Sequence, residues 1–360
     1  MNDLSRTKTA LRDVSVGLLF ILKNQIIYLR TLDQEPAAMA LSRGLLQSLG
    51  FLGSIFLIMS FYRWNMFERK RAERMHNLQE VRKQLLKENC KYDKEATSEG
   101  KQSFEDISDS EMKHLIVDDK HGIIYCYIPK VACTNWKRVM FVLKQGEPYQ
   151  DPSPISRDLA HVPGGFTLLN SFPRIEIKAR LKHYTKFLFV RHPFVRLTSA
   201  YRDKFEKGSN IYFDNFTREI LRLYGNQPNP PQTMAEASAS GVHISFYNFI
   251  QYLLDPQTER ELPFEPHWRQ MHRLCHPCLI QYDFIGHQET LQEDAEQLLN
   301  TLKLQNDIKF PPSYDNITAP ESLSGWFRTV PLVERRKLYK LYETDFRLFG
   351  YRKPDELLDG

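Results

Sequence analysis

An uncharged stretch of 19 residues, "GLLQSLGFLGSIFLIMSFY", constrains the fold of this chain more than any other feature. It covers residues 44–62, and Gln47 is its only strongly polar side chain. A helix of about 20 apolar residues spans a bilayer, whereas a buried core helix of this length usually has a charged edge. Basic residues follow from Arg63 onward, unlike the small residues that end a cleaved signal peptide. We therefore predict a membrane-spanning signal anchor at residues 44–62.

The segments on either side of this stretch are predicted as a tail and a stem. Residues 1–43 read as a tail, and Met39 is an alternative start that would make residues 1–38 an upstream extension. Residues 63–103 are highly charged with a thin apolar stripe, which favours a solvated helical stem or a short coiled coil. The basic residues after the anchor favour a cytoplasmic C-terminal side, an orientation that conflicts with evidence given below.

The remaining residues, 104–360, show the pattern of an α/β domain. "GIIYCYI" (122–128) and "KFLFV" (186–190) are apolar runs typical of buried strands. Helical spacing follows each run, at residues 135–144 and 195–205, and recurs at 244–254, 290–303 and 331–346. Strand and helix alternation predicts a parallel sheet with helices on both sides. The chain of 360 residues, 42% of them hydrophobic, has room for one such domain plus extras, or for two domains.

The turn "PKVACTN" joins the first strand to its helix and has the features of an anion site. A helix N-terminus presents unpaired N–H groups and a positive dipole end. Lys130 adds a mobile positive charge, and Thr134 can cap the helix or donate to an oxyanion. The alternative is an ordinary capped helix with a surface lysine. The Walker pattern GxxxxGK[ST] is absent from this turn.

The second strand ends in "VRHPFVRLTSAYRDKF". Arg191 lies at the carboxyl end of this strand, the usual ligand position in an open α/β sheet. Together with a hydroxyl on the next helix it can bind a phosphate. A solvated basic helix face is the alternative, and it accounts for Arg202 and Lys204 but not for an arginine that ends a buried strand.

The two turns together resemble the donor-binding elements of Golgi carbohydrate sulfotransferases of the HNK-1 sulfotransferase-like family. "PKVACTNW" looks like their 5′-phosphosulfate loop and "RHPFVRLTSA" like their 3′-phosphate element. "HLIVDDKHGIIYCYIPKVACTNWKRVM", "HYTKFLFVR", "HWRQMHRLCHPC", "YDFIGHQETLQEDA" and "LYKLYETDFRLFGYRKP" are similar to the chondroitin 4-O-sulfotransferase branch. The resemblance covers about residues 104–357. It implies a P-loop-like sulfotransferase domain that uses 3′-phosphoadenosine 5′-phosphosulfate (PAPS) and no metal.

The resemblance also assigns donor-binding residues. The 5′ element comprises Pro129, Lys130, Val131, Ala132, Cys133, Thr134 and Asn135. The 3′ element comprises Arg191, His192, Pro193, Phe194, Val195, Arg196, Leu197, Thr198 and Ser199. Within these, Lys130 would neutralise the leaving phosphate, Thr134 would hold the phosphosulfate, and Arg191 with Ser199 would fix the 3′-phosphate. His192 departs from the family, in which an acidic residue is typical.

A base must remove the proton of the acceptor hydroxyl, and histidine suits that task. His161 lies between the two donor elements, where related uronyl sulfotransferases place their histidine, so it is the first candidate. His267, in the family's "HW" element, is the second. For each, a structural hydrogen-bonded histidine is the alternative.

The resemblance implies a type II Golgi membrane protein with a lumenal domain at 104–360 and a cytoplasmic tail at 1–43. This orientation conflicts with the charges after the anchor. It makes the sequons at Asn215 and Asn316 glycosylation candidates. In an oxidising lumen a structural disulfide is the better interpretation of Cys275 and Cys278, because no second metal-binding pair accompanies them. Cys90 is either a bystander thiol or part of an interchain disulfide, and Cys126 and Cys133 are expected to be buried as small apolar groups.

The expected reaction is sulfation of the 4-hydroxyl of N-acetylgalactosamine in chondroitin-type chains, with dermatan or terminal N-acetylgalactosamine on glycoproteins as alternatives. A net charge of +5 suits an acidic glycosaminoglycan acceptor, and no nucleic-acid partner is expected. A homodimer and a monomer both stay open. Two alternative functions come from other functional classes: a P-loop kinase or nucleotide-binding module, and a non-catalytic, membrane-anchored glycan-binding protein.

Overall fold

The computed structural model describes residues 37–92, 103–260, 262–312 and 323–359; within the first range, side chains are described for residues 48–91. The chain divides between Ala72 and Glu73 into two units, and the second contains both predicted turns. The sequon at Asn316 and most of the predicted tail lie outside the described residues.

The first long helix, α2 (Ala37–Tyr92), includes the predicted anchor and most of the predicted stem. A search of the described ranges finds no helix with the length and apolar character needed to cross a bilayer. The anchor at residues 44–62 therefore stays a prediction.

Five strands form one mixed sheet in the order β3-β1-β2-β4-β5. The strands are β1 (Leu115–Asp118), β2 (Ile123–Cys126), β3 (Thr167–Leu168), β4 (Thr185–Val190) and β5 (Phe284–His287). β2, β4 and β5 run parallel, as predicted for the first two. β1 is antiparallel to β2 and β3, so a purely parallel sheet was wrong. The connection from β1 to β2 is a short turn through Gly122, which has a φ of 62°, and so short a connection permits only antiparallel pairing.

The predicted helices all form, with small shifts at their ends. The helices of the second unit are α3 (Cys133–Gln145), α4 (Arg157–Ala160), α5 (Arg174–His183), α6 (Pro193–Tyr201), α7 (Asn210–Tyr212), α8 (Arg218–Tyr224), α9 (Met234–Ser240), α10 (Phe246–Leu254), α11 (Met271–Cys275), α12 (Leu291–Thr301), α13 (Leu323–Phe327), α14 (Leu332–Leu348) and α15 (Asp355–Leu358). Two π-helical segments, η5 (Arg202–Glu206) and η6 (Phe213–Thr217), follow α6 and α7.

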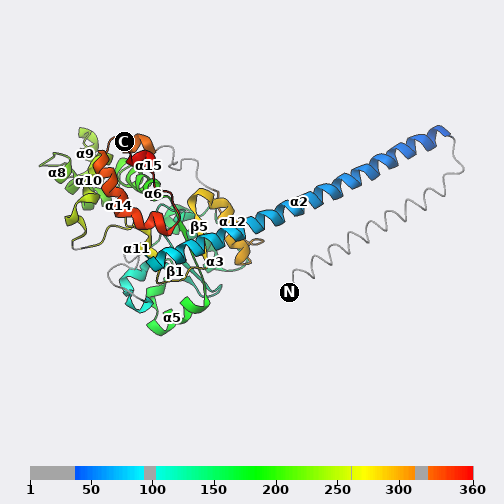
Figure 1. The fold of residues 1–360 in the computed structure, drawn as a ribbon, viewed down its shortest axis with the longest axis horizontal. Helices are drawn as coiled ribbons and strands as arrows, with labels where there is room; N and C mark the ends of the chain where they lie inside the picture. The colour runs from blue at the N-terminus through cyan, green and yellow to red at the C-terminus, as the bar shows by residue number, and fades with distance from the viewer. Residues whose placement is uncertain (1–36, 93–102, 261, 313–322, 360) are drawn as a thin grey trace. The chain divides into compact units, whose positions relative to one another are not determined.

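Two hydrophobic clusters form the core. The first surrounds the sheet, where Tyr125 and Phe187 stack with ring centroids 4.7 Å apart. Gly286 belongs to this packing, because a Cβ there would overlap the ring of Phe189. The second cluster joins α6, α8, α10 and α14, which group together in Figure 1, around Trp268. The turn after β2 belongs to the first cluster and α6 to the second, and Arg196 of α6 donates to the carbonyl oxygen of Pro129, so the two predicted donor elements are in contact.

The last part of α2 packs on the edge strand β5. Gln79 exchanges two hydrogen bonds with the backbone of Ile285, at 3.0 Å each. Arg82 donates to both carboxylate oxygens of the buried Asp294 at 2.9 Å. These contacts satisfy the backbone groups that an edge strand leaves unpaired. Residues 73–92 thus belong to the same compact unit as the sheet rather than forming a solvated stem.

Disulfides explain four of the five cysteines. Cys90 bonds with Cys278, and Cys126 with Cys275. The expectation for Cys90 was therefore wrong, because it is neither a bystander thiol nor an interchain bridge. Cys126 is buried as expected, but as half of a disulfide. Cys275 and Cys278 are both bridged as expected, but to different partners, since sequence spacing does not determine disulfide connectivity. Cys133 is a free thiol and only partly buried.

Candidate donor-binding and catalytic site

The turn between β2 and α3 has the backbone of an anion cradle. Lys130 and Ala132 adopt left-handed φ values of 70° and 47°, which non-glycine residues rarely do. Left-handed residues in such a turn let backbone N–H groups face one side, as in the nests that bind anions, although the N–H of Val131 donates to the carbonyl oxygen of Ile128 at 3.3 Å. Ala132 is the N-cap of α3, so the free N–H groups of its first turn add to this cradle. Residues 129–135 therefore fit a phosphosulfate group.

Arg191 connects the second donor element to this cradle. It follows β4 directly, is 4% exposed, and donates from Nη1 to the carbonyl oxygen of Lys130 at 3.0 Å. Burial lowers the pKa of Arg191 to about 10, which still leaves the side chain cationic at neutral pH. The charge of Arg191 thus lies at the carboxyl end of the sheet, beside the turn that holds Lys130.

His192 performs the local task of the acidic residue that is typical at this position. Its Nδ1 accepts from the N–H of Val195 at 3.4 Å, so it caps the N-terminus of α6 as an aspartate would. This bond requires a neutral ring. Burial and the neighbouring Arg191 lower the pKa of His192 to about 4, which keeps the ring neutral. A histidine in place of the family's acidic residue at position 192 is therefore compatible with an intact 3′-phosphate element.

Arg196 is part of the scaffold of the site. Its guanidinium is buried and donates to the carbonyl oxygens of Pro129 (3.0 Å), Arg269 (2.7 Å) and Pro266 (2.7 Å). It therefore ties the Lys130 turn to the loop that contains His267. We infer that Arg196 positions these two segments rather than binding a phosphate.

The other predicted residues of the 3′ element differ in accessibility. Ser199 is only partly buried, and its hydroxyl forms no hydrogen bond with a described residue, so it is available to a ligand. The remaining members are buried in the core or at its edge and serve packing: Pro193, Phe194, Val195, Leu197 and Thr198.

Lys130 lies in a cluster of charges that the sequence did not predict. Its Nζ is 3.2 Å from Oδ2 of Asp203, and the same oxygen is 3.3 Å from Lys204 Nζ and 3.6 Å from Arg157. Burial would raise the pKa of Asp203, but Lys130 and Lys204 outweigh it and lower the pKa to about 2. The Lys204 side chain is 11% exposed, so its assignment to a solvated basic face was wrong.

His161 reaches the same site from the loop after α4. Its Nε2 is 3.0 Å from the hydroxyl of Thr134, so the first candidate base contacts the first donor element. Partial loss of solvent, followed by the charges of Lys137 and Arg157, lowers the pKa of His161 to about 4. The ring is neutral at physiological pH but only weakly basic.

His267 forms a histidine–carboxylate pair at this site. Its Nδ1 is 2.8 Å from Glu265 and 3.0 Å from the hydroxyl of Tyr212. No described residue bonds with its Nε2, which is therefore free to accept a proton. Burial lowers the pKa of His267, while Glu265 raises it and Lys204 and Lys130 lower it further. A carboxylate on Nδ1 that orients the ring is a recurrent feature of histidine bases.

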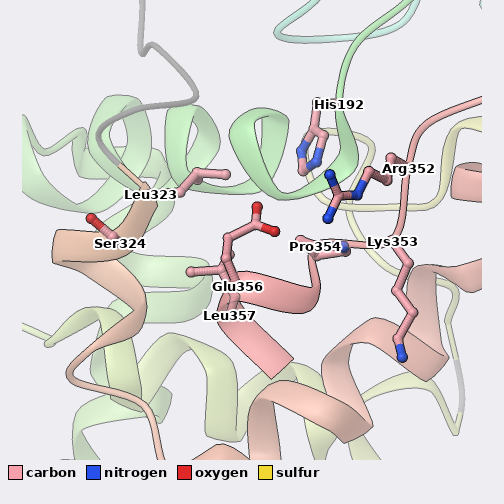
Figure 2. Close-up of a pocket in the computed structure, with 8 residues that line it drawn as sticks. All are labelled: His192, Leu323, Ser324, Arg352, Lys353, Pro354, Glu356 and Leu357. Atoms are coloured by element: carbon pink, nitrogen blue, oxygen red, sulfur yellow. The ribbon is translucent and has the colours of Figure 1, made fainter. Parts of the chain in front are cut away.

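A cavity of about 480 Å³ lies on the other side of His192. It is lined by His192 and by residues of α13, α15 and the segment before α15. Figure 2 shows the guanidinium of Arg352 between His192 and Glu356, whereas Lys353 points away. Arg352 therefore adds a second positive charge near His192, besides that of Arg191. Across the described ranges, no group of three or more histidine, cysteine, aspartate or glutamate side chains is arranged to hold a metal ion.

The structure thus brings Lys130, Thr134, His161 and His267 together from distant parts of the chain. Asp203, Glu265 and Tyr212 were missed by sequence reasoning. Glu265 had a signal, because it lies two residues before His267. Asp203 had none, since the π-helical segment η5 changes which residues face the site.

Comparisons with known families and proteins agree with the resemblance that the sequence motifs indicate. A profile of the sulfotransferase family matches residues 113–352. Carbohydrate sulfotransferase 12 of Mus musculus is 49% identical over 309 residues, covering 82% of this chain and 74% of that protein. The Xenopus laevis carbohydrate sulfotransferase 12 is 54% identical over 71% of this chain and 64% of its own length. Carbohydrate sulfotransferase 11 of Rattus norvegicus is 42% identical over 70% of each chain. No solved structure matches significantly.

Proposed function

This chain belongs to the sulfotransferase family and is a PAPS-dependent carbohydrate sulfotransferase, and we propose that it sulfates the 4-hydroxyl of N-acetylgalactosamine in chondroitin-type glycosaminoglycans. The observation that supports an acidic acceptor is the charge beside Lys130. Lys130, Lys204 and Arg157 surround the single carboxylate of Asp203, which leaves two positive charges in excess. Dermatan and terminal N-acetylgalactosamine on glycoproteins are the alternative acceptors.

The donor supplies an activated sulfuryl group when bound, and the protein's part is positioning and charge stabilisation. The N–H groups of residues 132–135 and the hydroxyl of Thr134 would hold the phosphosulfate end, whereas the N–H of Val131 already donates to the carbonyl oxygen of Ile128. Arg191 and Ser199 would hold the 3′-phosphate. Lys130 would stabilise negative charge on the 5′-phosphate as it leaves.

We propose that His267 is the base and Glu265 its positioning residue. His267 has a free Nε2 and an orienting carboxylate, whereas the Nε2 of His161 is engaged by Thr134. With its proton on Nε2, His161 would then donate to the Thr134 oxygen and leave the Thr134 hydroxyl proton available to the phosphosulfate. This order reverses the preference that the sequence alone suggests.

Product analysis tests the acceptor. The purified enzyme should transfer radiolabelled sulfate from PAPS to desulfated chondroitin, and disaccharide analysis should place the label at position 4 of N-acetylgalactosamine. Desulfated dermatan and a glycoprotein with terminal N-acetylgalactosamine serve as parallel acceptors. Label confined to position 6, or transfer only to one of the parallel acceptors, would exclude the proposed acceptor while leaving the enzyme class intact.

We also propose a type II topology in the Golgi membrane, with residues 44–62 as the anchor and the catalytic domain in the lumen. The exposed Asn215 and the two disulfides support a lumenal location. Expressed in animal cells, the protein should lose apparent mass on treatment with an N-glycosidase, and Asn215→Gln should remove one glycan. Asn229→Gln is the control, because Asn229 is also exposed but lies outside any sequon. A chain that is unaffected by the glycosidase would contradict the lumenal placement.

A further inference from the structure

The carboxylate of Asp203 pairs with Lys130, the lysine that we propose binds the donor. The side chains of Lys130 and Asp203 are 19% and 17% exposed, so their attraction is less screened than that of a surface pair. The three cations near Oδ2 of Asp203 are at 3.2, 3.3 and 3.6 Å, yet none is aligned as a hydrogen bond to this buried oxygen. The attraction between opposite charges therefore keeps Lys130 at Asp203.

The surroundings of Asp203 do not suit a catalytic base. A carboxylate with a pKa of about 2 is a weak proton acceptor at neutral pH. Its ion-pair partners are all side chains that border the proposed donor site, from the turn after β2, the first residue of α4 and η5 itself. The π-helical geometry of η5 places it there, and such segments are frequent at functional sites.

We propose that Asp203 is a resting partner of Lys130 that the 5′-phosphate of the donor displaces, so that Asp203 sets the affinity for the donor and for the nucleotide product. The inference rests on the proposed binding of the donor by Lys130. Before binding, the carboxylate offsets the repulsion between Lys130, Lys204 and Arg157. Binding exchanges one anion for another at the same lysine. After sulfate transfer, Asp203 pairs with Lys130 again, and this favours release of the nucleotide product.

Binding of 3′,5′-adenosine diphosphate, the nucleotide product, to the purified full chain tests this inference by calorimetry. Asp203→Asn should tighten binding about three- to tenfold, because the competing anion is lost. Asp203→Ser removes the same charge with a smaller side chain and should act in the same direction. The product should also become a stronger inhibitor of turnover by a similar factor. A purely structural Asp203 would instead weaken binding and lower the melting temperature when replaced.

Two further variants separate this inference from the assignment of Lys130. Lys130→Ala should weaken binding, and adding Asp203→Asn to it should then have little effect, since the competition acts through Lys130. Glu206→Gln, on the same π-helical segment but paired with Arg202, controls for net charge. Unchanged binding in Lys130→Ala would reject the donor role of Lys130. Weaker binding in Lys130→Ala together with unchanged or weaker binding in both Asp203 variants would reject the role of Asp203 alone.

Discussion

Replacement of Lys130 by alanine should lower kcat for sulfate transfer by about 10²- to 10³-fold, the effect of removing one preorganised charge-stabilising donor from an active site. Lys130 has a left-handed backbone conformation and its carbonyl oxygen accepts from Arg191, while its ammonium group lies 3.2 Å from Asp203 at the edge of the proposed donor site. Negative charge that builds on the leaving phosphate would lose the cation that we propose stabilises it. Transfer of radiolabelled sulfate to desulfated chondroitin measures the effect.

Two variants define the specificity of this result. Lys178→Ala removes an exposed lysine that pairs with Glu105 on the surface, and it should leave kcat unchanged. Lys130→Arg retains the charge but changes its shape and hydration, and it should recover only part of the rate. A Lys130→Ala enzyme within tenfold of the wild-type kcat, with normal folding, would remove Lys130 from the chemical step.

His267→Ala should lower kcat by about 10²- to 10⁴-fold, the range for loss of a general base. His161→Ala should cost less than about tenfold, because its proposed part is to position Thr134. His243→Ala is a matched control, since His243 is a histidine whose Nδ1 contacts only the nearby backbone oxygen of Gly241. A larger loss in His161→Ala than in His267→Ala would identify His161 as the base.

The pH profile distinguishes a positioned base from a structural histidine. A base works in its neutral form, so kcat should fall as pH falls through the pKa of His267, which burial lowers below the usual value. Glu265 raises the pKa of His267, so Glu265→Gln should move this acid limb to lower pH as well as reduce kcat. If the acid limb of the pH profile stays at the same pH in Glu265→Gln, a group other than His267 is responsible for that limb.

Sequence reasoning was most successful where a local pattern determines the structure. The apolar runs that end in Lys130 and Arg191 predicted strands followed by helices, and the structure has β2–α3 and β4–α6 at these places. Both turns lie at the carboxyl ends of neighbouring parallel strands, so their meeting follows from the topology. Each strand-to-helix turn could be predicted from the residues of its own segment alone.

Contacts between distant segments were not predictable from the sequence. Arg196 looks like a phosphate ligand in the motif, yet the carbonyl groups of Pro129, Pro266 and Arg269 consume its donors. Lys204 looks solvated on an α-helical wheel, but the wider π-helical turn brings it beside Asp203. Cys90 looks isolated in a charged segment, whereas the fold brings it to Cys278. In each case the partner is far away in sequence or the helical period differs from 3.6.

The packing of α2 on β5 determines where a fragment that contains the whole catalytic unit can begin. A protease that cuts between residues 92 and 103 would not free the catalytic domain from the preceding helix, since the bond between Cys90 and Cys278 would still join the two pieces. A fragment that starts at residue 104 would lack Gln79 and Arg82 and would expose the backbone of β5. A fragment that keeps the whole compact unit therefore begins at or before Glu73.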